Sequence, residues 1–287
     1  MTAPEEYVLF DAHNHLQDEW LLPHRAAVLS DLERTGVKKC VVNGTSELDW
    51  PAVSALARES SLVVPSFGLH PWDVGNRTPE WQTKMLHALD ANPSAAIGEI
   101  GLDRWMLDRA RPDDTRLEGL RRAPMPEQLD AFHWQLDLAT QRNLPTSIHC
   151  LEAFGAMHDA LRSRPLPARG FLLHAFSGSL EIAAAFVKLG GYFSFNGAFL
   201  DPRKERVRNV YAQLPFERLL VETDSPAMSV PSDRERFHLP HAATGQPVNH
   251  PANLVVAYEA LAAIRNVSLK ELTQQIAENF ARLFSAS

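Results

Sequence analysis

The chain has 287 residues, of which 45% are hydrophobic, and a formal net charge of −7. This length can bury a large core and suits either two modest domains or one α/β barrel. The negative charge argues against a protein that holds nucleic acid through an overall positive field, so any such contact must be local. No apolar run reaches membrane-spanning length, and we expect neither a membrane span nor a secretory leader. Only two cysteines are present, Cys40 and Cys150, far apart in apolar runs, and we therefore expect a cytoplasmic protein.

Short apolar, β-branched runs alternate with amphipathic stretches of helical length along the sequence. This alternation predicts eight strands, at residues 7–15, 39–45, 62–70, 95–103, 145–150, 170–177, 191–196 and 219–224. Helices are predicted between them, at residues 23–35, 48–60, 79–91, 127–142, 151–162, 180–189 and 202–214, and two more follow the last strand. Eight strands in one alternating series favour the α/β class and a (β/α)8 TIM barrel, built as a single domain over residues 1–287, rather than an open doubly wound sheet.

Several predicted helices begin after residues that cap helices. Thr78, Ser179 and Asp201 precede three of them, and Ser268 with Glu271 forms a capping-box signature before the last one. Two stretches lack a regular pattern. They are residues 104–126, which contain six arginines, and residues 226–249, which are rich in Pro, His and charge. We expect both to be irregular, and the sequence leaves the role of the arginine-rich insertion open.

Polar side chains follow the apolar runs at the points where the predicted strands end. They are His13, His15, His70, Glu99, Asp103, His149, His174 and Asp224. Active sites of barrels lie at this carboxyl-terminal end of the strands. His13 and His15 occupy positions i and i+2 of a strand, so both imidazoles project from one face and can reach one point in space. We expect Asp11, just before them, to orient a histidine.

The number of candidate ligands indicates more than one metal ion. Four imidazoles and two carboxylates exceed what one tetrahedral ion needs and suit two divalent ions that share a carboxylate. The predicted ligands are His13, His15, Glu99, His149, His174 and Asp224. Glu99 is the natural bridge, because its side chain can place one oxygen on each ion. Zinc, manganese, magnesium or a similar ion could bind, and the sequence does not choose among them.

Several motifs occur in an order that is similar to one known family. They are DAHNH (residues 11–15), GLHP (68–71), IGEIGLD (97–103), IHC (148–150), HAFSG (174–178), ETDSP (222–226), PANL (251–254) and NFARLF (279–284). Together they resemble the TatD-type metal-dependent hydrolases of the amidohydrolase superfamily. The resemblance implies a barrel, divalent metals and nuclease activity on DNA. By position, it implies one ion held by His13, His15, Glu99 and Asp224, and a second held by Glu99, His149 and His174.

The leading hypothesis is therefore a TatD-like deoxyribonuclease that cleaves phosphodiester bonds with a metal-activated water. Asp224 is the expected base and Glu99 the expected bridge. We predict His70, Arg104 and Trp72 as substrate contacts. The arginines of residues 104–126 and 203–208 offer phosphate partners, and Trp72, Trp105, Phe176 and Phe199 offer surfaces on which the bases of single-stranded DNA could stack.

Two departures from the family pattern leave the substrate open. The chain reads CLE after His149, where many members read SRD, and it carries the insertion at residues 104–126. Both indicate a divergent subgroup. The first alternative is a two-metal enzyme that acts on a small ester, lactone or amide, because the same metals can polarise a carbonyl. The second is a non-catalytic scaffold, which predicts a broken ligand set and ranks last because the set is intact.

Overall fold

The computed structural model describes residues 7–242 and 245–285. Its eight parallel strands are β1 (Leu9–Asn14), β2 (Val37–Gly44), β3 (Val63–Phe67), β4 (Ala96–Asp103), β5 (Thr146–Leu151), β6 (Phe171–Leu173), β7 (Gly191–Asn196) and β8 (Leu219–Glu222). The α-helices are α1 (Arg25–Arg34), α2 (Trp50–Glu59), α3 (Trp81–Ala91), α4 (Trp105–Asp108), α5 (Met125–Arg142), α6 (Phe154–Arg162), α7 (Leu180–Lys188), α8 (Glu205–Tyr211), α9 (Leu254–Arg265) and α10 (Leu269–Phe284). The predicted domain runs over residues 1–287, and its residues 1–6, 243–244 and 286–287 lie outside the described part.

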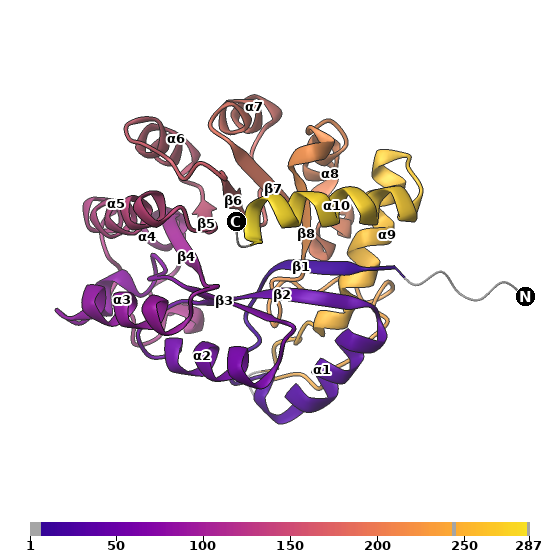
Figure 1. Cartoon of the computed structure of the whole chain (residues 1–287), viewed down its shortest axis with the longest axis horizontal. Helices are drawn as coiled ribbons and strands as arrows, with labels where there is room; N and C mark the ends of the chain where they lie inside the picture. Colours follow the sequence, from indigo (N-terminus) through magenta and orange to yellow (C-terminus); the bar gives the residue numbers. More distant parts are fainter. Residues whose placement is uncertain (1–6, 243–244, 286–287) are drawn as a thin grey trace, which may run out of the picture.

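The strands form one sheet whose order follows the chain from β1 to β8, with each neighbouring pair parallel. The helices surround the strands, and α10 lies against β1 and β8 (Figure 1). The first and last strands also meet. The Asp224 amide donates to the His13 carbonyl at 2.9 Å, and the His15 amide donates to the Ser225 carbonyl at 2.8 Å. The sheet is thus a nearly closed barrel, and the predicted TIM-barrel fold is confirmed.

Asp11 lies at this junction of β1 and β8 rather than against a histidine ring. Its carboxylate accepts hydrogen bonds from the Thr223 amide at 3.0 Å and the Thr223 hydroxyl at 2.6 Å. It also accepts from the His13 amide at 3.2 Å and from the Asn14 side chain at 3.1 Å. The expectation that Asp11 orients an imidazole is therefore wrong, because its side chain binds the backbone and the neighbouring strand.

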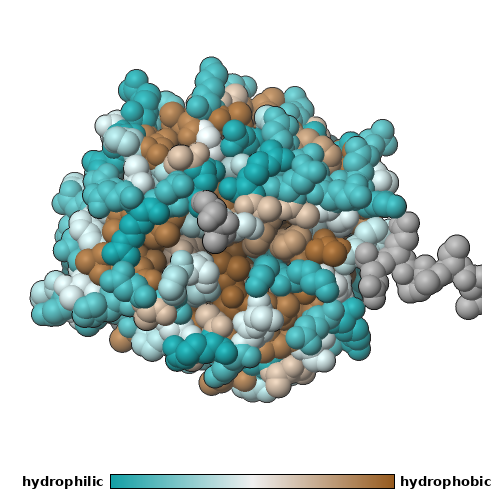
Figure 2. All heavy atoms as spheres, viewed as in Figure 1, coloured by the Kyte–Doolittle hydropathy of each residue, from teal (hydrophilic) through white to brown (hydrophobic). Residues whose placement is uncertain are grey.

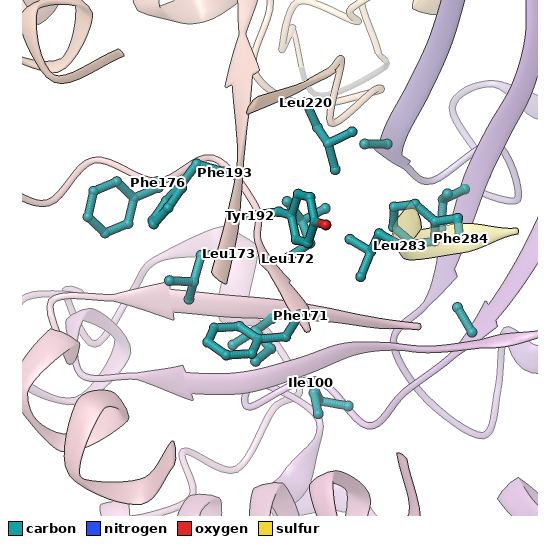
Figure 3. Close-up of a cluster of buried hydrophobic side chains, with 14 of the residues drawn as sticks. Ile100, Phe171, Leu172, Leu173, Phe176, Tyr192, Phe193, Leu220, Leu283 and Phe284 are labelled. Carbon is teal, nitrogen blue, oxygen red and sulfur yellow. The ribbon is translucent and has the colours of Figure 1, made fainter. Parts of the chain in front are cut away.

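Hydrophobic side chains fill the space between the strands and the helices. Figure 3 shows Phe171, Tyr192, Leu220 and Leu283, which come from β6, β7, β8 and α10, gathered in one such cluster. The surface is of mixed character. In Figure 2 hydrophilic residues line the edge of the visible face, with hydrophobic surface between them. The burial of apolar area on this scale is the main force that holds the helices to the barrel.

Three of the four predicted caps are confirmed, although Asp201 caps a 3₁₀ turn at Pro202–Lys204 that precedes α8. Ser179 accepts a hydrogen bond from the Ile182 amide, Asp201 from the Arg203 amide, and Ser268 from the Glu271 amide. Thr78 is the exception. Helix α3 begins two residues later than predicted, after Glu80, and the Thr78 hydroxyl donates to Glu47 instead. A contact between segments thus replaced the local cap.

Four predicted strands extend too far at the end that carries polar residues. β1 ends at Asn14, β3 at Phe67, β6 at Leu173 and β8 at Glu222. The turns that follow these strands hold His15, His70, His174 and Asp224. After β6 and β8 the chain leaves the extended region, with φ of +42° at Ala175 and +51° at Asp224. These turns place the polar side chains above the mouth of the barrel.

The insertion at residues 104–126 was expected to be irregular, but part of it is regular. It contains α4 and a 3₁₀ turn at Thr115–Leu117, and it has a small core of its own. Met106, Ala110 and Leu117 are buried in that core, with Trp72 and Trp105 packed beside them. Among the residues described, no helix combines the length and the apolar character needed to cross a bilayer.

Candidate metal centre

Six predicted ligands come together where the strands end. His13 is the penultimate residue of β1, Glu99 lies within β4, and His149 lies near the end of β5. His15, His174 and Asp224 lie in the turns after β1, β6 and β8. Donor atoms of His13, Glu99 and His174 lie within 4.8 Å of one another, and the same holds for His13, His15 and Asp224. A third group joins Glu99 and His149 to His70, which we had predicted as a substrate contact. The centre is therefore built on residues from six of the eight strand ends.

The two oxygens of Glu99 face two different groups of imidazoles. Oε2 lies 3.3 Å from His13 Nε2 and 3.4 Å from His15 Nε2. Oε1 lies 2.8 Å from His174 Nε2 and 3.0 Å from His149 Nδ1. The carboxylate is only 4% exposed. Each oxygen of the carboxylate therefore faces its own group of imidazoles, and the bridging role of Glu99 stays a prediction.

Asp224 stands beside the first of these groups. Its Oδ1 lies 3.4 Å from His15 Nε2 and 3.7 Å from His13 Nε2, and its side chain is 13% exposed. His70 stands beside the second. Its Nε2 lies 3.4 Å from Glu99 Oε1. Asp224 is thus the partly accessible carboxylate of the pair, whereas Glu99 is enclosed.

The rings of these histidines are held by groups outside the cluster. His15 Nδ1 lies 2.7 Å from the Asn43 carbonyl, which can only accept a hydrogen bond, so this nitrogen carries the proton. His13 Nδ1 lies 2.7 Å from the Ser147 hydroxyl. His149 Nε2 lies 3.1 Å from the Asp103 carboxylate. Such contacts fix the tautomer of an imidazole and leave its other nitrogen to bind a metal.

The charges of the cluster favour additional positive charge. Burial lowers the pKa of His15, yet the Asp224 and Glu99 carboxylates raise it well above its usual range. Burial also lowers the pKa of His149, but its hydrogen bonds to the Asp103 and Glu99 carboxylates raise that pKa to about 9. Burial would raise the pKa of Glu99, but the imidazoles of His174, His70 and His13 hold it well below the usual value. At His15 and His149 the carboxylates thus outweigh the effect of burial.

The donor atoms fit divalent cations. Because His15 keeps its proton on Nδ1, its Nε2 lone pair points toward the oxygens of Glu99 and Asp224, acceptor against acceptor. Only a proton or a metal cation between these atoms makes the arrangement favourable. His13 Nε2 lies 3.3 Å from His15 Nε2, so a cation placed there meets two imidazoles at once. Imidazole and carboxylate are the usual ligands of zinc and its neighbours.

The predicted substrate contacts have different outcomes. Trp72 lies at the edge of the centre, where its indole donates to Asp103 at 2.6 Å and its ring packs against His70. Trp105 lies on from Trp72, with the centroids of the two rings 6.1 Å apart. Phe176 and Phe199 are each 2% exposed, so the prediction that they stack on bases is wrong. They pack in the core instead.

The arginines of the insertion are occupied by neighbouring groups. Arg104 is 55% exposed, and it forms an ion pair at 3.6 Å with Asp108 rather than a contact with the centre. Four others pair with carboxylates, as Arg109–Glu152, Arg111–Asp113, Arg116–Asp114 and Arg121–Glu127. Arg122 donates to two backbone carbonyls. In the second predicted group, Arg203 pairs with Asp201, and Arg208 donates to the Phe199 and Asp201 carbonyls.

The comparisons with known proteins agree with the motifs. Residues 10–285 match the family described as "TatD related DNase". The chain belongs to this family. It is 28% identical to the uncharacterized metal-dependent hydrolase YabD of Bacillus subtilis, covering 96% of this chain and 99% of that one. It is 30% identical to the 3'-5' ssDNA/RNA exonuclease TatD of Escherichia coli, covering 81% of this chain and 88% of that one.

A solved structure shows the same architecture. The crystal structure of YjjV, a TatD homologue from Escherichia coli, superposes with a TM-score of 0.82 at 29% identity and covers 97% of this chain and 98% of that one. Membership of the family makes the protein a metal-dependent hydrolase with an amidohydrolase-type barrel.

Proposed function

We propose that the protein hydrolyses phosphodiester bonds, as a TatD-like deoxyribonuclease, with two divalent ions in the centre described above. The observation that carries this proposal is the position of Glu99, whose two oxygens face separate pairs of imidazoles. A shared carboxylate is typical of two-metal hydrolytic sites. The 30% identity to a single-stranded DNA and RNA exonuclease supports nucleic acid as the substrate class.

The residues divide into two sets around the bridge. His13, His15, Glu99 and Asp224 would hold one ion, and Glu99, His149 and His174 the other. Bound there, divalent ions would activate water as a nucleophile and neutralise the charge that develops on the phosphoryl oxygens. His70, 3.4 Å from Glu99, lies beside the second set. Its imidazole would bind either that ion or an oxygen of the scissile phosphate.

Asp224 would transfer the proton. Its side chain is the more exposed of the two carboxylates, and it lies at the open end of the barrel. It would take a proton from the attacking water as the new P–O bond forms. It would return that proton to the oxygen of the leaving group as the old P–O bond breaks. Water therefore supplies both the hydroxyl on the phosphate and the proton on the leaving group.

The substitutions Asp224→Asn and Glu99→Ala test the proposal. Protein stripped of metal and resupplied with manganese, magnesium or zinc would be assayed on short single-stranded DNA and on a small phosphodiester. Loss of a general base lowers the rate by about 10²–10⁴-fold, and we expect at least that loss in Asp224→Asn. Matched controls are Asp90→Asn and Glu278→Ala, whose carboxylates are 61% and 66% exposed on α3 and α10.

An Asp224→Asn protein that retains the turnover of the Asp90→Asn control would refute the proposed base. Cleavage of DNA by protein that holds no metal would refute the metal requirement. Cleavage of the small phosphodiester without cleavage of DNA would keep the chemistry and reject the polymer.

Hydrolysis of a small ester, lactone or amide is the second candidate, and one observation favours it. Five of the six arginines between residues 104 and 126 pair with nearby carboxylates, so the insertion offers few free cations for a phosphate backbone. The same assay with a panel of such substrates decides between the two. If the protein hydrolyses only small esters, lactones or amides, residues 104–126 would be interpreted as one wall of a small substrate pocket.

We also propose the cytoplasm as the compartment. Cys40 is buried on β2 and Cys150 is half-buried on β5, and both are free thiols on strands that are not neighbours. Free thiols of this kind are typical of proteins from reducing compartments.

A further inference from the structure

Glu222, the last residue of β8, is a fully buried carboxylate below the metal centre. In the described part of the chain, two side chains of β7 donate hydrogen bonds to it. The Ser194 hydroxyl donates to Oε2, and the Asn196 side chain donates to Oε1 at 3.3 Å. Moving a carboxylate out of water is costly unless hydrogen bonds and a positive or strongly polar partner compensate it. Two neutral donors are a modest compensation for such a group.

His174 offers the third partner. Its Nε2 lies 2.8 Å from the bridging carboxylate Glu99, and its Nδ1 points the other way, 3.7 Å from Glu222 Oε1. Within residues 7–242 and 245–285, this buried Nδ1 has no partner at hydrogen-bond distance. A neutral imidazole that gives Nε2 to a cation must carry its proton on Nδ1. The carboxylate of Glu222 stands where that proton needs an acceptor.

We propose that Glu222 is a positioning residue of the metal centre, whose carboxylate holds the Nδ1–H of His174 and so directs Nε2 at the second cation position. This inference rests on the proposed two-ion centre. Asp103 likewise stands behind His149, at 3.1 Å from Nε2 against 3.7 Å between Glu222 and His174 Nδ1, so both imidazoles of the second position face carboxylates. The imidazoles of the first position are backed by neutral groups, the Ser147 hydroxyl and the Asn43 carbonyl.

The difference between the two positions gives the proposal a specific consequence. A carboxylate behind an imidazole raises its basicity as a ligand, and loss of such a partner typically weakens metal binding by about 10–100-fold. Loss of the Glu222 charge should therefore weaken one of two ions and spare the other. A residue that only joined β7 to β8 would change the stability of the fold without that selective effect.

Glu222→Gln tests this, because glutamine keeps the length of the side chain and one acceptor oxygen but removes the charge. The matched control is Ser194→Ala, which removes another partner of Glu222 and leaves His174 unchanged. Zinc binding to metal-stripped full-length protein would be measured by competition with a chromophoric chelator, and the unfolding midpoint would be measured in parallel. We expect wild type and Ser194→Ala each to bind two ions, and we expect the affinity for each ion to be the same in the two proteins. Glu222→Gln should lose about 10–100-fold at one ion only.

The outcomes separate this proposal from the one on which it rests. A wild-type protein that binds fewer than two ions refutes the two-ion centre itself. Two ions in wild type with unchanged affinities in Glu222→Gln refute the role of Glu222. Equal losses in Glu222→Gln and Ser194→Ala, with equal loss of stability, assign Glu222 a structural role and also refute it.

A measurement on the wild-type protein covers the case in which Glu222→Gln does not fold. Nitrogen-15 NMR of the zinc-loaded protein, labelled at histidine, reports which ring nitrogen carries the proton, and the His174 signal would be assigned from a His174→Gln spectrum. We expect the proton of His174 on Nδ1. A proton on Nε2 would overturn the proposal.

Discussion

Asp103 shows how much one buried carboxylate can organise. Its Oδ2 accepts from the Trp72 indole at 2.6 Å and faces His149 Nε2 at 3.1 Å, while Oδ1 accepts from the Met106 amide at 2.8 Å. Burial raises the pKa of Asp103, but its hydrogen bond with His149 and the charge of that ring lower it below the usual value. One side chain therefore fixes an imidazole, an indole and the first turn of α4.

Asp103→Asn should weaken both the metal centre and the fold. The amide cannot accept from all three donors, and a buried donor left without a partner costs about 1–3 kcal/mol in the free energy of unfolding. The loss of charge behind His149 should lower metal affinity by about 10–100-fold. Urea unfolding and zinc competition measure the two effects. The control is Asp113→Asn in the same insertion, whose carboxylate is 69% exposed. Equal zinc affinity in the two variants would contradict this role of Asp103.

The convergence of the candidate metal ligands could be predicted from the sequence, whereas the groups that hold their rings could not. His13 and Glu99 follow or lie in apolar runs, and parallel strands end at one face, so their convergence follows from strand order. Ser147 lies 134 residues from His13, and its contact depends on how the barrel curves. No local pattern distinguishes such a serine from any other. The same holds for Glu222, which the ETDSP motif contains but to which it assigns no partner.

The strands and helices follow the periodicity of the sequence. Most errors of the prediction concern the ends of these elements, and one short helix was missed. Eight strands were predicted and eight are observed, because a buried parallel strand leaves a continuous apolar run. Helix α4 was missed, since four residues are too few for a helical period to appear. The core beneath it joins Met106, Ala110 and Leu117 at irregular spacing, and only its folded path shows that they meet.

His250 connects the segment after β8 to α1. Its Nδ1 accepts from the Ala252 amide at 3.1 Å, and its Nε2 lies 3.3 Å from Asp31 of α1. Burial lowers the pKa of His250 below the usual value, against the opposing charges of Asp31 and Glu235, while His24 lowers it further. The unfolded chain therefore binds a proton at a pH where the folded protein does not. The contribution of His250 to stability therefore falls as the pH falls below about 6.5, by at most about 1.4 kcal/mol per pH unit.

His250→Asn should remove this part of the pH dependence. Asparagine can still accept from the Ala252 amide, as it does at other helix starts, but it does not titrate. Urea unfolding between pH 5 and pH 7 should give a flatter slope for the variant than for wild type. His238→Asn, with a side chain that is 69% exposed, serves as the control and should keep the wild-type slope. Identical slopes in wild type and His250→Asn would contradict the assignment.

The closed barrel makes the metal centre part of the stability of the fold. The candidate ligands belong to β1, β4, β5 and the turns after β1, β6 and β8, so bound cations would join segments from one end of the sheet to the other. Without cations, the same segments hold several buried carboxylates and imidazoles close together. Any ion that binds the folded chain and not the unfolded one stabilises the folded state by mass action.

Removal of metal should therefore lower the unfolding temperature, and resupply should restore it. One ion present at 100 times its dissociation constant contributes about 2.7 kcal/mol, which corresponds to a shift of about 5–10 °C in a chain of this size. Differential scanning calorimetry with and without a chelator measures the shift. Asp90→Asn, on the exposed end of α3, should show the wild-type shift, whereas His149→Ala should show a smaller one because it lacks a ligand of the second position. An unfolding temperature that is the same with chelator and with zinc would show that the cluster is held together by its own protons and hydrogen bonds, and would refute the metal centre.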